Sequence, residues 1–307
     1  YYCAQVKKKI NNQKFDLILT SDTTTVAYLD TNIPIVIWLD TMFQSWYSHY
    51  YSKKKNSQKT YEEGNLCEQN AINKASNILL TSQWAKNEVF KFYKCKKNKI
   101  NVLPFGSNLE NSPTLGKITK KKYTIKDKCK IISVGVDWER KGFVRTIGIC
   151  NLIRKKGLNV ELTIIGASTN KSNSFPNWVK IYKFLDKNKK NSRQFISKHL
   201  LESDFHLLMT KSEAFGVVFV EASAYGVFNI APNIGGIKGA IKNNINGKLF
   251  NPSIKNQKIA NYIYNSYLDK KRLRNKMISS KIFYDRNLNW NVIGLKFNKI
   301  IINKVLN

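Results

Sequence analysis

The chain has 307 residues, enough for two domains of ordinary size, and it carries a formal net charge of +32. It contains neither an apolar run near the ~18 residues that span a bilayer nor a basic-then-apolar leader, so the sequence indicates neither membrane spanning nor secretion. Its five cysteines are odd in number and widely scattered, which disfavours a disulfide framework or a zinc site and favours a cytoplasmic location.

The positive charge is concentrated after residue 110. The first 110 residues hold 15 lysines against 9 acidic residues, and the remainder holds 37 basic against 11 acidic residues. Two interpretations stay open. The charge attracts anions such as nucleotide donors, an acidic membrane surface or nucleic acid, or it reflects coding bias, because lysine outnumbers arginine 45 to 7. No named nucleic-acid-binding motif occurs, which disfavours nucleic acid as a partner.

The first part of the chain alternates predicted strands and helices. Strands are predicted at 15–21, 34–40, 77–82 and 99–105, and helices at 62–75 and 83–93. This order is typical of a doubly wound α/β domain, which we expect over residues 1–110. We expect it to lack its first elements, because no opening strand with a glycine-rich loop is present.

A polar segment at 109–128 is interpreted as a linker, and a second α/β domain is expected over 111–286. Its predicted strands are 130–136, 160–167, 179–185, 204–210 and 227–232, and its predicted helices are one ending near 156, 192–202 and 254–268, followed by a basic segment. The last helix is predicted at about 290–305, within a terminal segment 287–307.

The stretch from Asp204 to Phe250 predicts a strand, a polar turn, a helix ending at Gly226 and a second strand. Ligands of parallel α/β sheets bind beyond the carboxyl ends of the strands. The helix start near Gly216 offers backbone N–H groups and partial positive charge to a phosphate. Glu221 points back toward that start, and its carboxylate suits sugar and ribose hydroxyls. The pattern therefore predicts a ligand with both phosphates and hydroxyls, such as a nucleotide-sugar.

Five ordered features of this stretch resemble the donor-site signature of retaining group-1 (family 4) glycosyltransferases of the GT-B fold. They are Glu213 and Glu221 with seven residues between them, the intervening Phe215-Gly216, the segment 222–226, Gly235-Gly236 and Asn246-Gly247. The resemblance implies α/β architecture with two Rossmann-like doubly wound domains. It also implies transfer of a sugar from a nucleotide-diphosphate-sugar to an acceptor hydroxyl, in polysaccharide, glycolipid or glycoconjugate synthesis.

The same resemblance assigns roles within the donor site. It implies that Glu221 holds the ribose hydroxyls and that Glu213 is a catalytic residue near the donor sugar. It also implies that the backbone N–H groups of Phe215, Gly216 and Val217 orient hydroxyls or the β-phosphate. The terminal segment 287–307 is expected to return to the first domain.

Lys141 is expected to contact the donor phosphates, because the family places a lysine before glycine at this position. Many relatives also carry an arginine directly after the first glycine, where this chain has Gly135 followed by Val136. Arg140 is the candidate that replaces it. Positive charge here would neutralise the departing diphosphate without a metal, and the chain has no Asp-x-Asp pair, so no metal and no cofactor besides the donor substrate is expected.

Asp40 follows the second predicted strand, where relatives place residues near the reacting sugar. It is interpreted either as an active-site carboxylate or as the cap of a helix starting near Thr41.

The acceptor is expected to be a sugar, a lipid-linked molecule or a glycan. The basic run Lys270-Lys271-Arg272 is either a peripheral contact with an anionic membrane, at its inner face, or a solvated charged surface. Two other functions stay open: a phosphorylase or sugar-phosphate synthase that shares the fold, and a truncated, non-catalytic nucleotide-binding GT-B protein.

Overall fold

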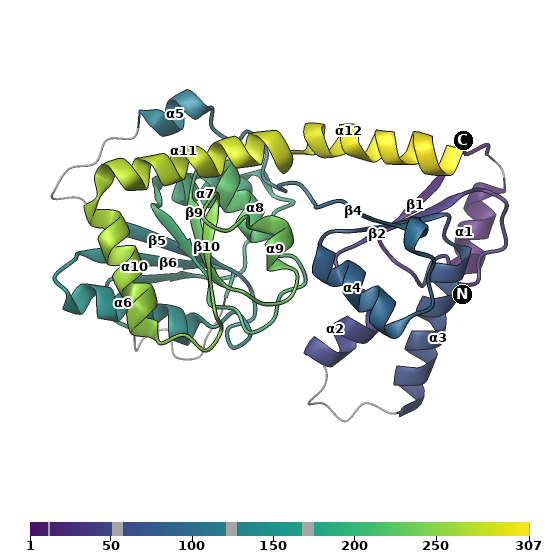
Figure 1. Cartoon of the computed structure of the whole chain (residues 1–307), viewed down its shortest axis with the longest axis horizontal. Helices are drawn as coiled ribbons and strands as arrows, with labels where there is room; N and C mark the ends of the chain where they lie inside the picture. Colours follow the sequence, from purple (N-terminus) through teal and green to yellow (C-terminus); the bar gives the residue numbers. More distant parts are fainter. Residues whose placement is uncertain (12, 51–57, 121–127, 168–174, 307) are drawn as a thin grey trace. The chain divides into compact units, whose positions relative to one another are not determined.

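The computed structural model describes residues 1–11, 13–50, 58–120, 128–167 and 175–306. The chain divides into two compact units, one formed by Tyr1–Phe105 with Ile293–Asn307 and the other by Gly106–Val292. From sequence, these boundaries are expected at residues 110 and 286. Each unit contains its own parallel β-sheet (Figure 1).

Among its described residues, the first unit has four strands, in the order in which they occur along the chain. They are β1 (Ile18–Thr20), β2 (Ile35–Leu39), β3 (Asn77–Leu80) and β4 (Ile100–Val102). All four residues of β3 are buried, as expected for an inner strand that is covered on both faces. The register pairs Val36 of β2 with Asn77 of β3 and continues to Leu39 with Leu80.

Helices cover this first sheet. They are α1 (Tyr2–Ile10), α2 (Phe43–Tyr50), α3 (Gln58–Lys74), α4 (Gln83–Phe92), the 3₁₀ turn η1 (Lys97–Lys99), α12 (Trp290–Ile301) and the π turn η3 (Ile302–Leu306). Ile293 and Ile301 of α12 pack into one core with Val36 and Leu79 of the sheet. The carboxy-terminal helix therefore belongs to the first unit for most of its length.

Within the ranges that the structure describes, the second unit has six parallel strands in the order β10-β9-β8-β5-β6-β7. They are β5 (Cys129–Val134), β6 (Val160–Ile165), β7 (Val179–Tyr182), β8 (Phe205–Leu207), β9 (Phe228–Pro232) and β10 (Gly247–Phe250). The chain runs outward from β5 to β7 and then returns to place β8 on the other side of β5. The strand order therefore reverses between β5 and β8, and a ligand crevice is expected at the carboxyl ends of these two strands.

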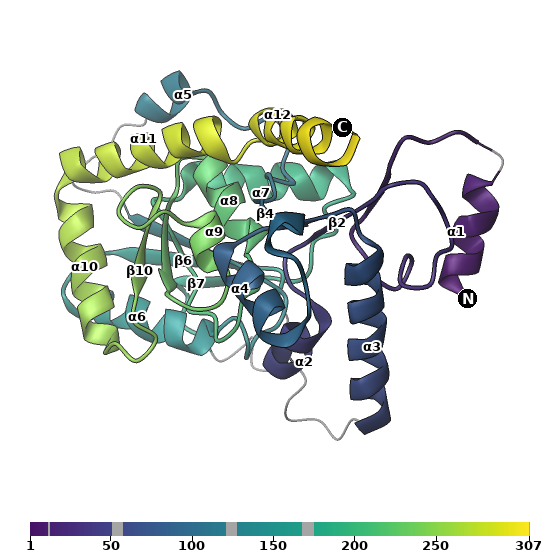
Figure 2. The same ribbon diagram turned by 45° about the vertical axis from the view of Figure 1, so that its right-hand side comes forward.

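The helices of the second unit lie on both faces of its sheet. They are α5 (Leu115–Thr119), α6 (Phe143–Lys155), α7 (Lys190–Glu202), α8 (Val217–Ala224), α9 (Ile237–Ala240), α10 (Asn256–Leu268) and α11 (Lys270–Asn287). Figures 1 and 2 both show α6 and α10 on one face, and α7, α8 and α11 on the other. None of the helices in the described ranges combines the length and apolar content needed to cross a bilayer.

Several elements differ from the sequence expectation, among them the helices α1 and α9, which were not predicted. The segment expected to be a linker contains α5, whose Ile118 is buried against Gly226. The basic segment after residue 268 forms the 18-residue helix α11, which hides Leu273 and Met277 among exposed basic side chains. Gly247–Phe250 forms the edge strand β10, where no strand was predicted. In each case few apolar residues carry the packing, so the periodic pattern is weak.

Candidate functional site

The loops that follow β5 and β8 lie together at the expected crevice. Two glycines with left-handed backbone shape it: Gly142, at φ +67°, precedes α6, and Gly216, at φ +87°, precedes α8. A Cβ on Gly142 would overlap the carbonyl oxygen of Met209 after β8. Glycine therefore allows both the turn and the close approach of the two loops.

Lys141 and Glu213 meet in this crevice. The ammonium of Lys141 donates to Glu213 Oε2 at 2.5 Å, and the two side chains are 9% and 10% exposed. A Cβ on Gly135 would lie 2.8 Å from Cγ of Lys141, so the missing side chain makes room for the lysine stem. The carbonyl of Glu213 accepts from the N–H of Gly236 at 3.0 Å, which fixes the loop. Three residues singled out from sequence are thus adjacent: Gly135, Lys141 and Glu213.

A second ion pair lies one turn into α8. The ammonium of Lys187 lies 2.6 and 2.7 Å from the two carboxylate oxygens of Glu221. Glu221 is 1% exposed, and this burial raises the pKa of its carboxyl group, while Lys187 and the backbone N–H of Asn108 act in the opposite direction. Sequence reasoning missed Lys187, because it comes from the β7–α7 loop and no motif links it to Glu221.

Arg140 joins the two loops of the crevice. Its guanidinium donates to the carbonyl of Ser212 at 3.2 Å and lies 3.5 Å from Oδ2 of Asp137. Its own carbonyl accepts from the backbone N–H of Lys211 at 2.7 Å and from the hydroxyl of Thr210 at 3.1 Å. These contacts show that Arg140 connects the β5–α6 loop to the segment after β8. The role of Arg140 as a phosphate ligand stays a prediction.

At the start of α8, the groups that can contact a ligand are backbone N–H groups rather than side chains. The Phe215 ring is fully buried in the core, so this residue has only its backbone to offer a ligand. Gly216 caps the helix without a side-chain hydrogen bond, and Val217 is its first residue and half-buried. The predicted contacts of these N–H groups with a donor are untested.

A buried polar network holds α8 against β9 and β10. The Asn229 side-chain amide donates to the Phe219 carbonyl at 3.1 Å and to the Ser223 hydroxyl at 3.0 Å. The Asn246 amide donates to the same hydroxyl at 3.0 Å. The Asn246-Gly247 feature of the sequence pattern therefore positions the helix that carries Glu221.

His206 on β8 completes this network. Its Nδ1 lies 2.9 Å from Oδ1 of Asn229, and its buried Nε2 has no hydrogen-bond partner among the described atoms. Burial lowers the pKa of His206 from 6.5 to about 4, with a smaller contribution from the charge of Lys141. The imidazole is therefore neutral at physiological pH.

Asp40 lies in the first unit, directly after β2, and is half-buried. The first two backbone N–H groups of α2 have other acceptors: that of Phe43 donates to Glu68 Oε1 at 3.1 Å, and that of Gln44 donates to the Tyr93 hydroxyl at 3.0 Å. Both groups therefore have acceptors other than Asp40. Its expected role in the active site stays a prediction.

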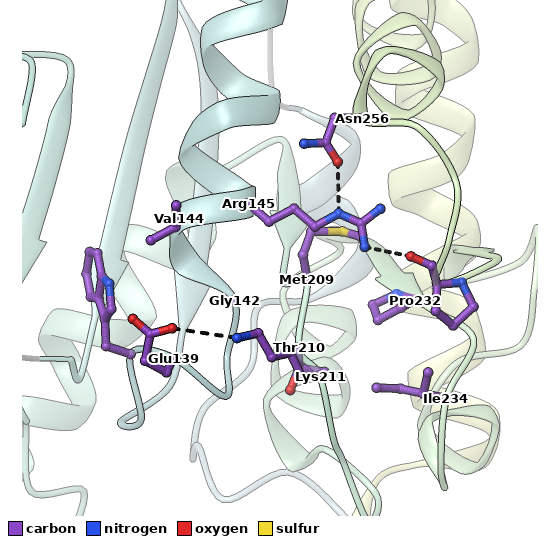
Figure 3. Close-up of a pocket in the computed structure, with 12 residues that line it drawn as sticks. Glu139, Gly142, Val144, Arg145, Met209, Thr210, Lys211, Pro232, Ile234 and Asn256 are labelled. Carbon is purple, nitrogen blue, oxygen red and sulfur yellow. Dashed lines mark hydrogen bonds and ion pairs between the residues drawn. The ribbon is translucent and has the colours of Figure 1, made fainter.

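A cavity of about 810 Å³ lies on the α6 and α10 side of the same sheet edge (Figure 3). Its charged side chains already have partners. Arg145 donates to the Asn256 side chain and to the carbonyls of Pro252 and Ile254 at 2.7–2.8 Å, and Lys211 lies 3.6 Å from Glu139. Four separate segments of the chain line this cavity, so no local sequence pattern marks it.

Comparison with known sequences identifies a family. The model of the family described as glycosyl transferases group 1 matches residues 117–282. The capsular polysaccharide biosynthesis glycosyltransferase CapM of Staphylococcus aureus is 30% identical over 199 residues, which are 60% of this chain and 49% of that protein. The chain thus spans about half the length of the curated relative it matches.

Solved structures share the architecture. Sucrose-phosphate synthase from Thermosynechococcus elongatus matches with a TM-score of 0.76 and 16% identity, over 98% of this chain and 77% of that one. Anabaena HepE, solved in complex with UDP, matches with a TM-score of 0.71 and 16% identity, over 98% and 82%. At such identities the likeness shows the fold alone, and it confirms the GT-B architecture that the sequence predicts.

Proposed function

Because the chain belongs to the group 1 glycosyl transferases, we propose that it transfers a sugar from a nucleotide-diphosphate-sugar to an acceptor hydroxyl, with retention of the anomeric configuration. The observation that carries this proposal is the Lys141–Glu213 pair in the crevice, beside the helix that bears Glu221. The group offers cations and helix N–H groups for phosphates, and carboxylates for hydroxyls. Complexes of HepE with UDP and with UDP-glucose support this class of donor.

In the proposed reaction the bond from the anomeric carbon to the β-phosphate oxygen breaks and a bond to the acceptor oxygen forms. The acceptor proton passes to the departing diphosphate. Lys141 stabilises the negative charge that grows on that diphosphate, because its ammonium is held in place before the reaction. Glu213 holds the donor sugar through its hydroxyls, and Glu221 holds the ribose. This scheme assigns charge neutralisation to side chains of the chain itself.

We place the acceptor among sugars, lipid-linked molecules and glycans of polysaccharide or glycolipid synthesis, on the cytoplasmic face of a membrane. The name of the matched relative, CapM, supports a polysaccharide role. The start of α11 supports contact with an anionic surface, because it exposes Lys271 and Arg272 and no acidic residue lies in its first turn.

The test is calorimetric titration of the chain with uridine, guanosine and adenosine diphosphates, repeated on Glu221→Ala and on the exposed control Glu139→Ala. We expect one nucleotide to bind, the Glu221 variant to lose that binding and the control to keep it. Absence of binding by all three nucleotides would contradict the proposal.

The nucleotide that binds names the donor class for an acceptor screen. Product analysis with and without inorganic phosphate then separates a transferase from a phosphorylase. Nuclear magnetic resonance of the anomeric proton in the product reports retention or inversion.

A further inference from the structure

The carboxylate expected to hold the ribose is already occupied. Both oxygens of Glu221 accept from the ammonium of Lys187, at 2.6 and 2.7 Å, and Glu221 is only 1% exposed. Ribose hydroxyls that bind this carboxylate take the place that the ammonium fills. Lys187 must therefore move aside when a nucleotide enters.

The side chain of Lys187 is the part that can move. It is 30% exposed, whereas its partner is almost fully buried. Its backbone is anchored, because the Lys187 carbonyl accepts from the Arg193 guanidinium at 2.7 Å. Rotation about the side-chain bonds therefore releases Glu221 without moving the β7–α7 loop.

The displaced ammonium needs a new counter-charge. The charged or titratable groups that the structure places around Glu221 are Lys187 and Tyr225, and Tyr225 binds Ser197 through its hydroxyl at 2.6 Å. The nearby Arg193 lies 3.7 Å from Glu110. Glu110 is thus paired with Arg193, and the carboxylate of Asp186 accepts from the backbone N–H of Asn188 at 2.9 Å, so neither offers Lys187 an unpaired acid. The incoming ligand brings one, since a diphosphate is attached to the ribose that displaces the lysine.

Lys141 and Arg140, two other cations of the crevice, already have protein partners, so the diphosphate can use a further cation. Lys141 is bonded to Glu213, and the Arg140 guanidinium is bonded to the Ser212 carbonyl and lies beside Asp137. A nucleoside diphosphate carries at least two negative charges, so one lysine leaves part of that charge without a partner.

We propose that Lys187 is an exchanging ligand of the donor site: it pairs with Glu221 in the empty protein and moves to the diphosphate when the ribose hydroxyls take over Glu221. The inference rests on the proposed function and adds a phosphate ligand that no sequence motif assigns. It gives Lys187 opposite effects on the two halves of the ligand. The ion pair opposes binding of the nucleoside, and the same ammonium favours binding of the diphosphate.

The experiment compares a nucleoside with its diphosphate, using the base that the wild-type protein binds. Dissociation constants of uridine and uridine diphosphate, or the guanosine or adenosine pair, are measured for wild type, Lys187→Met, Lys187→Arg and the exposed control Lys189→Met. Calorimetry serves for the diphosphate and competitive displacement for the nucleoside. The quantity compared is the factor by which the diphosphate group tightens binding.

In Lys187→Met we expect this factor to fall by about tenfold or more, the scale of one lost charge-assisted hydrogen bond. Nucleoside binding should stay the same or tighten. Lys187→Arg should keep most of the factor, and Lys189→Met all of it. A Lys187→Met protein in which nucleoside and diphosphate weaken equally would show that Lys187 only supports Glu221 and would overturn the exchange. An unchanged factor would overturn it as well, whereas failure of wild type to bind any diphosphate would instead refute the proposed function.

Discussion

The ammonium of Lys141 lies 2.5 Å from Oε2 of Glu213, and the two side chains are 9% and 10% exposed. They come from loops 72 residues apart in the chain, one after β5 and the other after β8. Removing one member of such a buried pair leaves the other charge without compensation. Substitutions at either position therefore have large effects, and isosteric variants with surface controls are needed to interpret them.

Glu213→Gln separates chemistry from binding. Glutamine keeps the volume and still accepts a hydrogen bond from Lys141, so we expect the dissociation constant of the nucleoside diphosphate to change by no more than about threefold. We expect kcat to fall by about 100-fold or more, the scale of one preorganised electrostatic contact. Both constants are measured beside Glu139→Gln, an exposed carboxylate of the β5–α6 loop. Equally small effects on both constants would remove Glu213 from the reaction centre.

Lys141→Met tests the phosphate ligand. The variant keeps the apolar stem that lies against Gly135 but removes the ammonium. We expect binding of the nucleoside diphosphate to weaken by about tenfold or more, because a charge-assisted contact is lost. Calorimetry on this variant is compared with calorimetry on Lys211→Met, because the Lys211 side chain is 67% exposed and its ammonium lies 3.6 Å from Glu139. An unchanged dissociation constant in Lys141→Met would exclude the role.

Gly142→Ala and Gly157→Ala separate backbone strain from steric overlap. Both glycines have positive φ, +67° and +87°, and alanine there costs about 1 kcal/mol. A Cβ on Gly157 meets nothing within 4 Å, whereas one on Gly142 overlaps the carbonyl oxygen of Met209. We expect Gly142→Ala to lower the unfolding free energy by about 1–3 kcal/mol more than Gly157→Ala. Urea unfolding followed by circular dichroism measures the difference, and equal losses would contradict the close approach of the two loops.

His206 makes stability depend on pH. Its pKa in the folded protein is about 4, below the usual 6.5, so the unfolded chain takes up a proton first as the pH falls. The stability that the neutral imidazole contributes is complete above pH 6.5 and is lost as the pH falls from 6.5 to about 4, at about 1.4 kcal/mol per pH unit.

His206→Gln should remove this part of the pH dependence while keeping a polar side chain near Asn229. The measurement is the difference in unfolding free energy between wild type and variant across pH 4 to 7. A difference that does not vary with pH would show that His206 titrates normally in the folded protein.

The sequence by itself determined the two α/β units and the donor-site motif. Near-continuous apolar runs mark β3, β5, β6 and β9, because strands buried on both faces need apolar residues along most of their length. Gly142 and Gly216 precede α6 and α8, where the backbone has the positive φ that glycine accepts without strain. Glu213 and Glu221 could be singled out because they lie eight positions apart on one continuous segment.

Only the tertiary structure decided which charges meet. The pairing of Lys141 with Glu213 spans 72 residues, and that of Lys187 with Glu221 spans 34. These partners come together because the strand order reverses between β5 and β8, which brings separate loops to one edge of the sheet. The same packing gave Arg140 a carbonyl partner and buried Ile118 of the expected linker. Local patterns specify elements, whereas ion pairs between loops depend on the arrangement of the whole sheet.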